Sequence, residues 1–314
     1  MVWKQLLLAV LCLILMLMLW SFTDVFYIVA RQDLPACHIE QPEIPLAKHP
    51  AIDWRTYWVN QTTTNLTLWD DRLTKFIQLI GSQAVEVNGS RAVTFTLADM
   101  AYAYVLLQPY FILMRACSNG LKNWASMCEH FGHSAYFVVA TTEETAAYLA
   151  QLNIPHIYYT PAGREDIQAA ETVLMIKFEM PHRLIEAGLN VLLSEMDVFW
   201  AKDPWRYISG QADIEISQHS YHTENNFGIF TVRSTPTTRL LYRKAMEVLR
   251  EHVSILRPYY GKTIDQKLMD VLLQGPNSSL TQIQQFLNQT QIAYIPLPVT
   301  WRYMNMEMFY HKMH

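Results

Sequence analysis

The chain has 314 residues, of which 51% are hydrophobic and 17% are charged, and its formal net charge is -4 at pH 7. This composition excludes an intrinsically disordered chain, because such chains lack the apolar residues that a core requires. It also argues against general nucleic-acid binding, since the sequence contains no block of lysine and arginine. The length allows one catalytic-size domain with additional segments.

The first predicted element is a membrane anchor. Residues 5–23 carry no charge and are rich in leucine, and their number is close to the roughly 20 residues that span a bilayer. Lys4 precedes this run, whereas Asp24 and Arg31 follow it, so we expect a cytoplasmic tail of residues 1–4 and a translocated body. A cleaved signal peptide is the alternative, but the residues after the run are a poor cleavage context.

Residues 24–90 have the composition of a stem, with prolines at positions 35, 42, 45 and 50. One short amphipathic helix is predicted within it, from Leu68 to Ile80. Triplets of the form Asn-x-Ser/Thr begin at Asn60, Asn65, Asn88, Asn277 and Asn288. Together with a translocating segment, these N-glycosylation signals agree with a lumenal or extracellular body.

Three cysteines lie outside the anchor, at Cys37, Cys117 and Cys128. An odd number leaves at least one thiol free or paired between chains. Cys117 and Cys128 are close in sequence and could form a bridge in an oxidising lumen.

Residues 91–314 alternate between strand and helix patterns and are expected to form the catalytic domain. Strands are predicted at 92–97, 135–140, 156–159, 191–193, 214–217, 228–232 and 293–296, and helices at 100–115, 121–131, 143–152, 167–188, 237–252 and 265–273. Such alternation predicts an α/β fold, with a mostly parallel sheet flanked by helices.

The most informative motif follows the buried strand at 191–193. Glu195 and Asp197 stand one residue apart, so an extended chain would place both carboxylates on one side and Met196 on the other. Ligands of open α/β sheets bind beyond the carboxyl ends of the strands. Two hard oxygen donors at that edge suit a divalent cation that also bridges phosphates. A pair of ordinary solvated carboxylates is the plain alternative.

Further motifs accompany this one in a particular order. They are Lys177 in the preceding helix, Gly188–Pro204 around the acids, Asn226-Phe227-Gly228 with Thr231–Thr235, and Asp265-Gln266 at the start of a helix. Over residues 91–301 they resemble the nucleotide-diphospho-sugar transferases of glycosyltransferase family 77. The resemblance implies a GT-A fold, a UDP-sugar donor, a manganese ion and retention of anomeric configuration. It also implies glycan or glycoprotein acceptors in the Golgi.

The resemblance assigns a role to each motif. Asp197 would bind Mn²⁺ (or Mg²⁺) directly and so neutralise the diphosphate, and Glu195 would serve the ribose or a metal-bound water. Asn226 and Gly228 would lie against the donor sugar, because an amide can recognise hydroxyls and glycine allows close approach.

Asp265 and Gln266 would sit beside the anomeric carbon and the sugar hydroxyls. Asp265 also suits a helix N-terminus electrostatically, which is its plain alternative. Lys177 would reach the diphosphate or the ribose, although a helix lysine is more often simply solvated.

The sequence departs from the family pattern in three places. Glu195 replaces the usual first aspartate, and Met269 and Asp270 stand where the family carries an asparagine. The C-terminal His-Gly-Lys motif is not recognisable. His311 is therefore the candidate third metal ligand, with His219 or His222 as substitutes.

These patterns lead to one expected function and two alternatives. We expect a single-pass type II Golgi membrane protein that transfers sugar from a UDP-sugar to a hydroxyl with retention. The main alternative is a catalytically inactive, membrane-tethered GT-A-like protein that binds a nucleotide sugar or acts as a scaffold. A secreted carbohydrate-binding module is the third possibility. The sequence leaves the donor sugar, the acceptor and the oligomeric state open.

Overall fold

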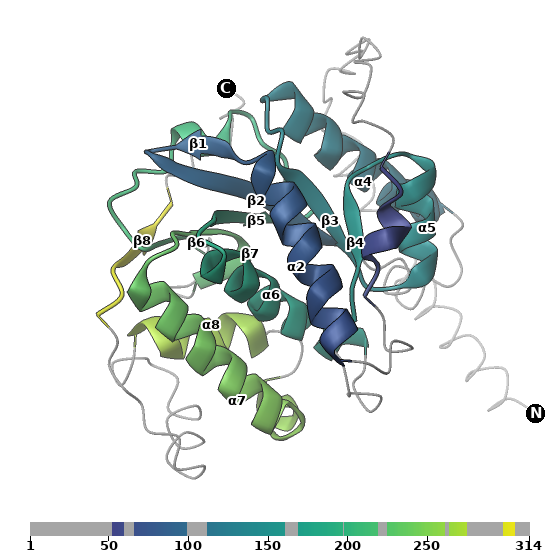
Figure 1. Ribbon diagram of the computed structural model, residues 1–314. Helices are drawn as coiled ribbons and strands as arrows, with labels where there is room; N and C mark the ends of the chain where they lie inside the picture. Colours follow the sequence, from purple (N-terminus) through teal and green to yellow (C-terminus); the bar gives the residue numbers. More distant parts are fainter. Residues whose placement is uncertain are drawn as a thin grey trace, which may run out of the picture. The chain divides into compact units, whose positions relative to one another are not determined.

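An eight-stranded sheet forms the centre of the molecule (Figure 1). The computed structural model describes residues 52–59, 66–98, 112–160, 169–196, 198–218, 225–260, 264–274 and 298–304, all within the unit Leu46–His314. The strands are β1 (Val85–Val87), β2 (Ser90–Ala98), β3 (Tyr136–Ala140), β4 (His156–Tyr158), β5 (Asn190–Ser194), β6 (Ile214–Gln218), β7 (Asn225–Val232) and β8 (Trp301–Tyr303).

The strand order is β4-β3-β2-β5-β7-β6-β8, and β1 pairs with β2 as an antiparallel hairpin. Strands β4, β3, β2 and β5 are parallel to one another, and β6 is parallel to β8. Strand β7 is antiparallel to both β5 and β6. The start of β7 therefore lies at the same sheet edge as the carboxyl ends of β5 and β6, which is where the acidic motif follows β5.

Helices cover both faces of this sheet. They are α2 (Leu66–Ser82), α4 (Ile112–His130), α5 (Glu143–Gln151), α6 (Ala169–Glu186), α7 (Pro236–Tyr260) and α8 (Ile264–Gln274), with short 3₁₀ turns η1 (Trp54–Tyr57) and η2 (Pro204–Arg206). Helices α6, α7 and α8 lie side by side (Figure 1). Alternation along each strand divides the core: Val191 and Leu193 face α2, α6 and α7, whereas Leu192 faces α4 and α5.

The α/β prediction is confirmed, with strands and helices close to most of the predicted positions. Thr142 caps α5, as its sequence position indicates, because its hydroxyl accepts a hydrogen bond from the Thr145 amide. The helix predicted at 121–131 belongs to the longer α4, and β8 is a strand that the pattern did not predict. The strand predicted at 293–296 lies outside the described residues.

The folded core begins before residue 91, the predicted boundary between stem and catalytic domain. Trp54, Phe76 and Ile80 are buried in the same apolar cluster as the sheet residue Phe137. Their burial explains the amphipathic pattern of α2, because its apolar face covers the sheet. Part of the predicted stem is therefore packed protein.

The membrane anchor predicted at residues 5–23 lies outside the described residues. Within the residues that are described, none of the helices has both the length and the apolar character needed to span a bilayer.

The proposed Cys117–Cys128 bridge is wrong, because Cys128 is a free, buried thiol. Both positions belong to α4, where 11 residues of rise separate them by about 16 Å. A disulfide requires Cα atoms within about 7 Å. Burial raises the pKa of the Cys128 thiol well above its ordinary value, as expected for a structural rather than a reactive cysteine.

Of the glycosylation triplets, only the one at Asn88 lies among the described residues. Asn88 is exposed in the β1–β2 hairpin turn, where it and Gly89 both have positive φ. An Asn-Gly pair is the preferred sequence of such a turn. Its side-chain Nδ2, the atom that a glycan would modify, donates to the Ile208 carbonyl at 3.4 Å, and glycosylation stays a prediction.

Candidate functional site

The acidic motif and the Asn226–Gly228 motif meet where β5 ends and β7 begins. The backbone amide of Glu195 donates to the carbonyl of Gly228 at 2.8 Å, which continues the antiparallel pairing one residue beyond β5. Two motifs that lie far apart in the sequence therefore share one sheet edge. This edge is the one at which ligands bind in open α/β folds.

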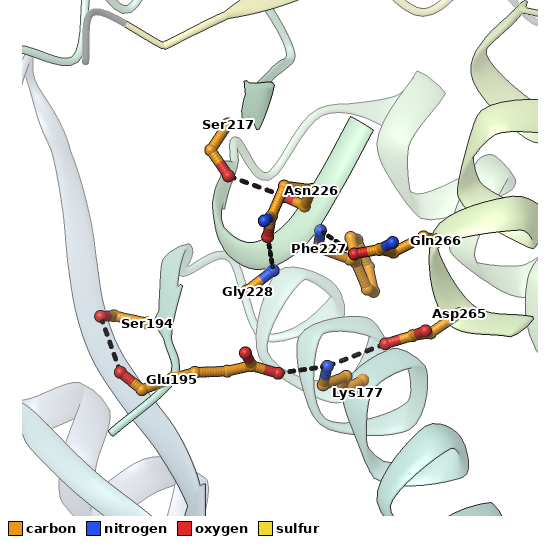
Figure 2. Close-up of polar contacts among 9 residues, drawn as sticks. All are labelled: Lys177, Ser194, Glu195, Ser217, Asn226, Phe227, Gly228, Asp265 and Gln266. Atoms are coloured by element: carbon orange, nitrogen blue, oxygen red, sulfur yellow. Dashed lines mark hydrogen bonds and ion pairs between the residues drawn. The ribbon is translucent and has the colours of Figure 1, made fainter. Parts of the chain in front are cut away.

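The side chain of Lys177, on α6, lies between the side chains of Glu195 and Asp265 (Figure 2). Its ammonium Nζ donates to Oε1 of Glu195 at 2.5 Å and to Oδ2 of Asp265, at the start of α8, at 2.8 Å. The Lys177 side chain is 8% exposed, and that of Glu195 is 37% exposed. We call Lys177, Glu195 and Asp265 the charged cluster. It connects the strand end, α6 and α8 through one ammonium group.

The charged cluster keeps Lys177 protonated. Burial by itself would lower the pKa of the ammonium, but the charges and hydrogen bonds of Asp265 and Glu195 outweigh it and raise the pKa above its ordinary value. The alternative of a simply solvated helix lysine is therefore wrong. The cluster carries two carboxylates and one ammonium, so a net negative charge remains at the edge of the sheet.

Gly228 allows the Glu195 carboxylate to approach the backbone of β7. A Cβ atom at position 228 would lie 2.8 Å from Oε2 of Glu195 and 2.9 Å from Oδ1 of Asn226, both closer than real contacts permit. A larger residue here would push the ends of these two side chains out of their observed positions. The sequence predicted that role, although for a ligand rather than for Glu195.

Asn226 and Gln266 use their carbonyl oxygens within the protein. Oδ1 of Asn226 accepts from the Gly228 amide at 2.8 Å, and Oε1 of Gln266 accepts from the Phe227 amide at 3.4 Å (Figure 2). The NH₂ groups are the donors that these two side chains can offer to a hydroxyl. Both residues therefore lie at the predicted site and also shape the start of β7.

Asp270 is a site-supporting residue whose role the sequence did not reveal. Its Oδ1 accepts from the side-chain Nδ2 of Asn225 at 2.5 Å and from the Asn225 amide at 3.3 Å, and both residues are buried. Asp270 follows Gln266 by four residues, so both side chains point from one face of α8 toward the start of β7. That spacing is the signal that could have indicated their shared role.

On the opposite side, indole, imidazole, hydroxyl and carboxylate side chains hold the segment that follows the acidic motif. The indole Nε1 of Trp200 donates to Oγ of Ser194 at 3.0 Å. His133 Nε2 contacts Oδ1 of Asp203 at 2.9 Å, and its Nδ1 contacts Oγ1 of Thr94 on β2 at 3.2 Å. We call these five residues the indole–imidazole network.

The remaining predicted site residues, Asp197 and His311, lie outside the described residues, as do His219 and His222. Among the residues that are described, no group of three or more His, Cys, Asp or Glu side chains is placed to hold a metal ion. Glu195 could contribute Oε2 to a cation, since its Oε1 accepts from Lys177. A hard oxygen donor beside Asp197 in the sequence fits a Mn²⁺ or Mg²⁺ ion.

The fold and this edge define a class of protein: a GT-A-like transferase with a polar site at the carboxyl ends of a mixed sheet. The nucleotide-diphospho-sugar transferase family model matches residues 132–314, more than half of the chain, and the chain belongs to that family. The family implies a nucleotide-sugar donor and a glycosyltransferase activity. Strand β2, at the centre of the sheet, lies before the matched range.

Comparison with solved structures finds a glycosyltransferase involved in the glycosylation of the major capsid of PBCV-1. It is 11% identical, with a TM-score of 0.32, and the match covers 68% of this chain and 82% of that chain. A search of curated proteins finds no match. The family assignment therefore depends on the family model.

Proposed function

We propose that this chain transfers a sugar from a UDP-sugar donor to a hydroxyl of a glycan or glycoprotein, with metal dependence and retention of configuration. The observation that carries the proposal is the charged cluster at the sheet edge, where Lys177 joins Glu195 to Asp265. These residues come from the three motifs that resemble a nucleotide-sugar site. Their meeting at one place is what a shared active site requires.

The donor sugar would lie beside the start of β7. The NH₂ groups of Asn226 and Gln266 would donate to its hydroxyls, because their carbonyl oxygens already accept backbone hydrogen bonds. The negative charge of Asp265 would then lie near the anomeric centre, where positive charge develops as the bond to UDP breaks. Lys177 would hold that carboxylate in place.

Asp197 and Glu195 would hold a divalent cation, which when bound would offset the charge of the departing diphosphate. Lys177 offsets the charge of one of the two acids in the charged cluster, and the remaining negative charge favours a cation at the same edge of the sheet. Retention would follow if the acceptor hydroxyl attacks from the face that the diphosphate leaves. The proposed location is the Golgi lumen, with residues 5–23 as a type II anchor, residues 24 onward as a stem, and the catalytic part extending to residue 314.

The test measures UDP release by the full-length chain in detergent, with a panel of UDP-sugars and with or without Mn²⁺. We expect Mn²⁺-dependent turnover that Asp197→Ala abolishes and Asp265→Asn strongly reduces. Asp71→Asn is the matched control, because Asp71 is an exposed carboxylate on α2 paired with Lys75. Turnover that Asp197→Ala and Asp265→Asn leave intact would contradict the assigned site.

One observation favours the inactive scaffold as a second candidate. Glu195 stands in place of the usual first acid, and Lys177 already neutralises its Oε1. A scaffold would bind UDP-sugars, measured by calorimetry, without releasing UDP in the presence of Mn²⁺ and mixed glycan acceptors. Mn²⁺-dependent donor hydrolysis would exclude it.

A further inference from the structure

Phe199 is the most exposed large apolar side chain in the described part of the chain. It is 60% exposed, whereas Leu240 on α7, the next such residue, is 39% exposed. Its neighbour Trp200 is buried. The same short loop therefore turns one aromatic ring into the core and presents another to solvent, two residues after Asp197.

Trp200 fixes the backbone next to Phe199. Its indole donates to Ser194 on β5, and its backbone amide lies 3.3 Å from Sδ of Met127 on α4. The Trp200 ring also packs against Trp124, with ring centroids 6.3 Å apart. Because these contacts of Trp200 hold the backbone in place, the loop keeps the neighbouring Phe199 side chain exposed.

A second anchor follows a few residues later. Oδ1 of Asp203 accepts from the Trp205 amide at 3.0 Å and contacts His133 at 2.9 Å. The Trp205 indole donates to Thr94 on β2 at 3.1 Å. The loop from Trp200 to Trp205 is thus attached to the sheet at both ends, so its outer surface is preorganised.

The backbone at Phe199 lies near that of Glu195, one member of the charged cluster. The Val198 amide donates to the Glu195 carbonyl at 3.0 Å, which closes a tight turn. In such a turn the Cα atoms of the first and last residues lie within about 7 Å, and one more residue adds about 3.8 Å. The Cα of Phe199 is therefore within about 11 Å of that of Glu195. At this distance, an acceptor sugar on the Phe199 ring would lie next to a donor bound at the charged cluster.

An exposed phenyl ring beside a sugar-transfer site has a specific chemical use. One face of a pyranose presents C–H groups, which pack against the electron-rich face of an aromatic ring. We propose that Phe199 binds the acceptor, with its ring stacked on the C–H face of an acceptor sugar. This inference rests on the proposed function and assigns the acceptor class as a glycan rather than a bare peptide.

The experiment compares the full-length chain with Phe199→Ala and Phe199→Trp. The probes are the methyl glycosides of galactose, xylose, arabinose and mannose, together with lactose and cellobiose. Two quantities are measured: donor hydrolysis without acceptor, and the KM for each acceptor. Leu240→Ala is the matched control for removing an exposed apolar side chain.

We expect Phe199→Ala to raise the acceptor KM about tenfold, equivalent to about 1.4 kcal/mol, while donor hydrolysis changes less than about twofold. Phe199→Trp, which keeps an aromatic ring, should have an acceptor KM close to that of the wild type. Leu240→Ala should change neither the acceptor KM nor donor hydrolysis.

The outcomes separate this inference from the proposed function. An unchanged acceptor KM in Phe199→Ala, or an equal loss of donor hydrolysis, overturns the acceptor role alone. The same conclusion follows if none of the glycosides binds the wild-type chain or raises UDP release above hydrolysis. Absence of donor turnover in the wild-type chain would overturn the proposed function as well.

Discussion

The acidic motif is supported from two sides by different chemistry. On the side of α6 and α8, the charged cluster holds Glu195 through an ammonium group shared with Asp265. On the side of β2 and α4, the indole–imidazole network holds the following loop through Ser194, Trp200 and His133. A buried ion pair contributes little net stability, whereas satisfied hydrogen bonds and ring packing such as those of Trp200 contribute modestly and reliably. We therefore expect changes in the charged cluster to affect the proposed activity, and changes in the indole–imidazole network to affect the stability of the loop.

The strongest test of this comparison is Lys177→Met. The change removes the ammonium and leaves Glu195 and Asp265 as uncompensated neighbouring carboxylates, so we expect UDP release to fall about 100-fold or more. Unfolding in urea should show a loss of about 3 kcal/mol, near the low end for a broken buried pair because Glu195 is partly exposed.

Lys75→Met is the control, since Lys75 forms an exposed i,i+4 pair with Asp71 on α2. Its stability should change by less than about 1 kcal/mol, with no effect on turnover. If Lys177→Met releases UDP at the wild-type rate, the charged cluster is not needed for activity.

The second test concerns a histidine outside the indole–imidazole network, His156, and asks whether its hydrogen bond with an indole is lost in acid. At the other edge of the parallel strands, the Trp58 indole donates to Nε2 of His156 at 3.1 Å, and Nδ1–H of His156 donates to the Ile154 carbonyl at 2.8 Å. Burial lowers the pKa of His156 to about 4 from 6.5. The unfolded chain then binds more protons between these values, so stability is complete above pH 6.5 and is lost as the pH falls toward 4.

The expected loss is about 3 kcal/mol, since each pKa unit corresponds to about 1.36 kcal/mol. His156→Gln supplies a comparable acceptor that does not titrate and should flatten this part of the stability profile, measured by urea unfolding at several pH values. Burial also lowers the pKa of His182, which remains in both proteins and contributes equally. Identical slopes for the two proteins would show that His156 is not the responsible group.

Gly228→Ala tests whether the position of the Glu195 carboxylate matters, because it disturbs the charged cluster without removing a charge. The new Cβ would displace the Glu195 carboxylate from its position 2.8 Å away, so we expect turnover to fall between about 10- and 100-fold. Stability should fall by no more than about 1 kcal/mol, because the crowded atoms are the movable ends of side chains. Gly120→Ala, within α4, is the matched control, because the new Cβ would meet only the Met196 carbonyl, at an ordinary contact distance of 3.8 Å. That variant should gain about 0.5–1 kcal/mol from helix propensity. Equal effects of the two substitutions would mean that crowding at Glu195 is unimportant.

The smallest expected effect lies in the indole–imidazole network. Trp200→Phe keeps an aromatic ring but removes the indole donor to Ser194 and part of the buried ring, and it should cost about 1–2 kcal/mol. UDP release without acceptor should be unchanged. Ser194→Ala removes the same hydrogen bond from its other end. The double variant should then lose less than the sum of the single changes, by about 1 kcal/mol in a double-mutant cycle. Additive losses would show that the hydrogen bond contributes nothing.

Local pattern predicted much of the fold. The apolar runs at β3 and β5, the capped start of α5 and the amphipathic face of α2 were recognisable because burial on one face imposes a period of two or 3.6 residues. The start of the folded core was not, because Trp54 and Phe76 are apolar residues in a segment rich in proline and glycosylation signals. Their burial depends on a distant partner, Phe137.

The sequence by itself determined the α/β pattern and the acidic motif with Glu195, because residue type and spacing carry that information. The resemblance of their motifs to the transferase family made candidates of Lys177, Asn226, Gly228, Asp265 and Gln266. Only the tertiary structure decided that Lys177 bonds two acids, 18 and 88 residues away in sequence. It also decided that Asp270 supports Asn225, and that Phe199 faces outward while Trp200 faces inward. The reason is physical: periodicity reports which face of an element is buried, whereas the partner of a buried charge is set by how helices and strands pack.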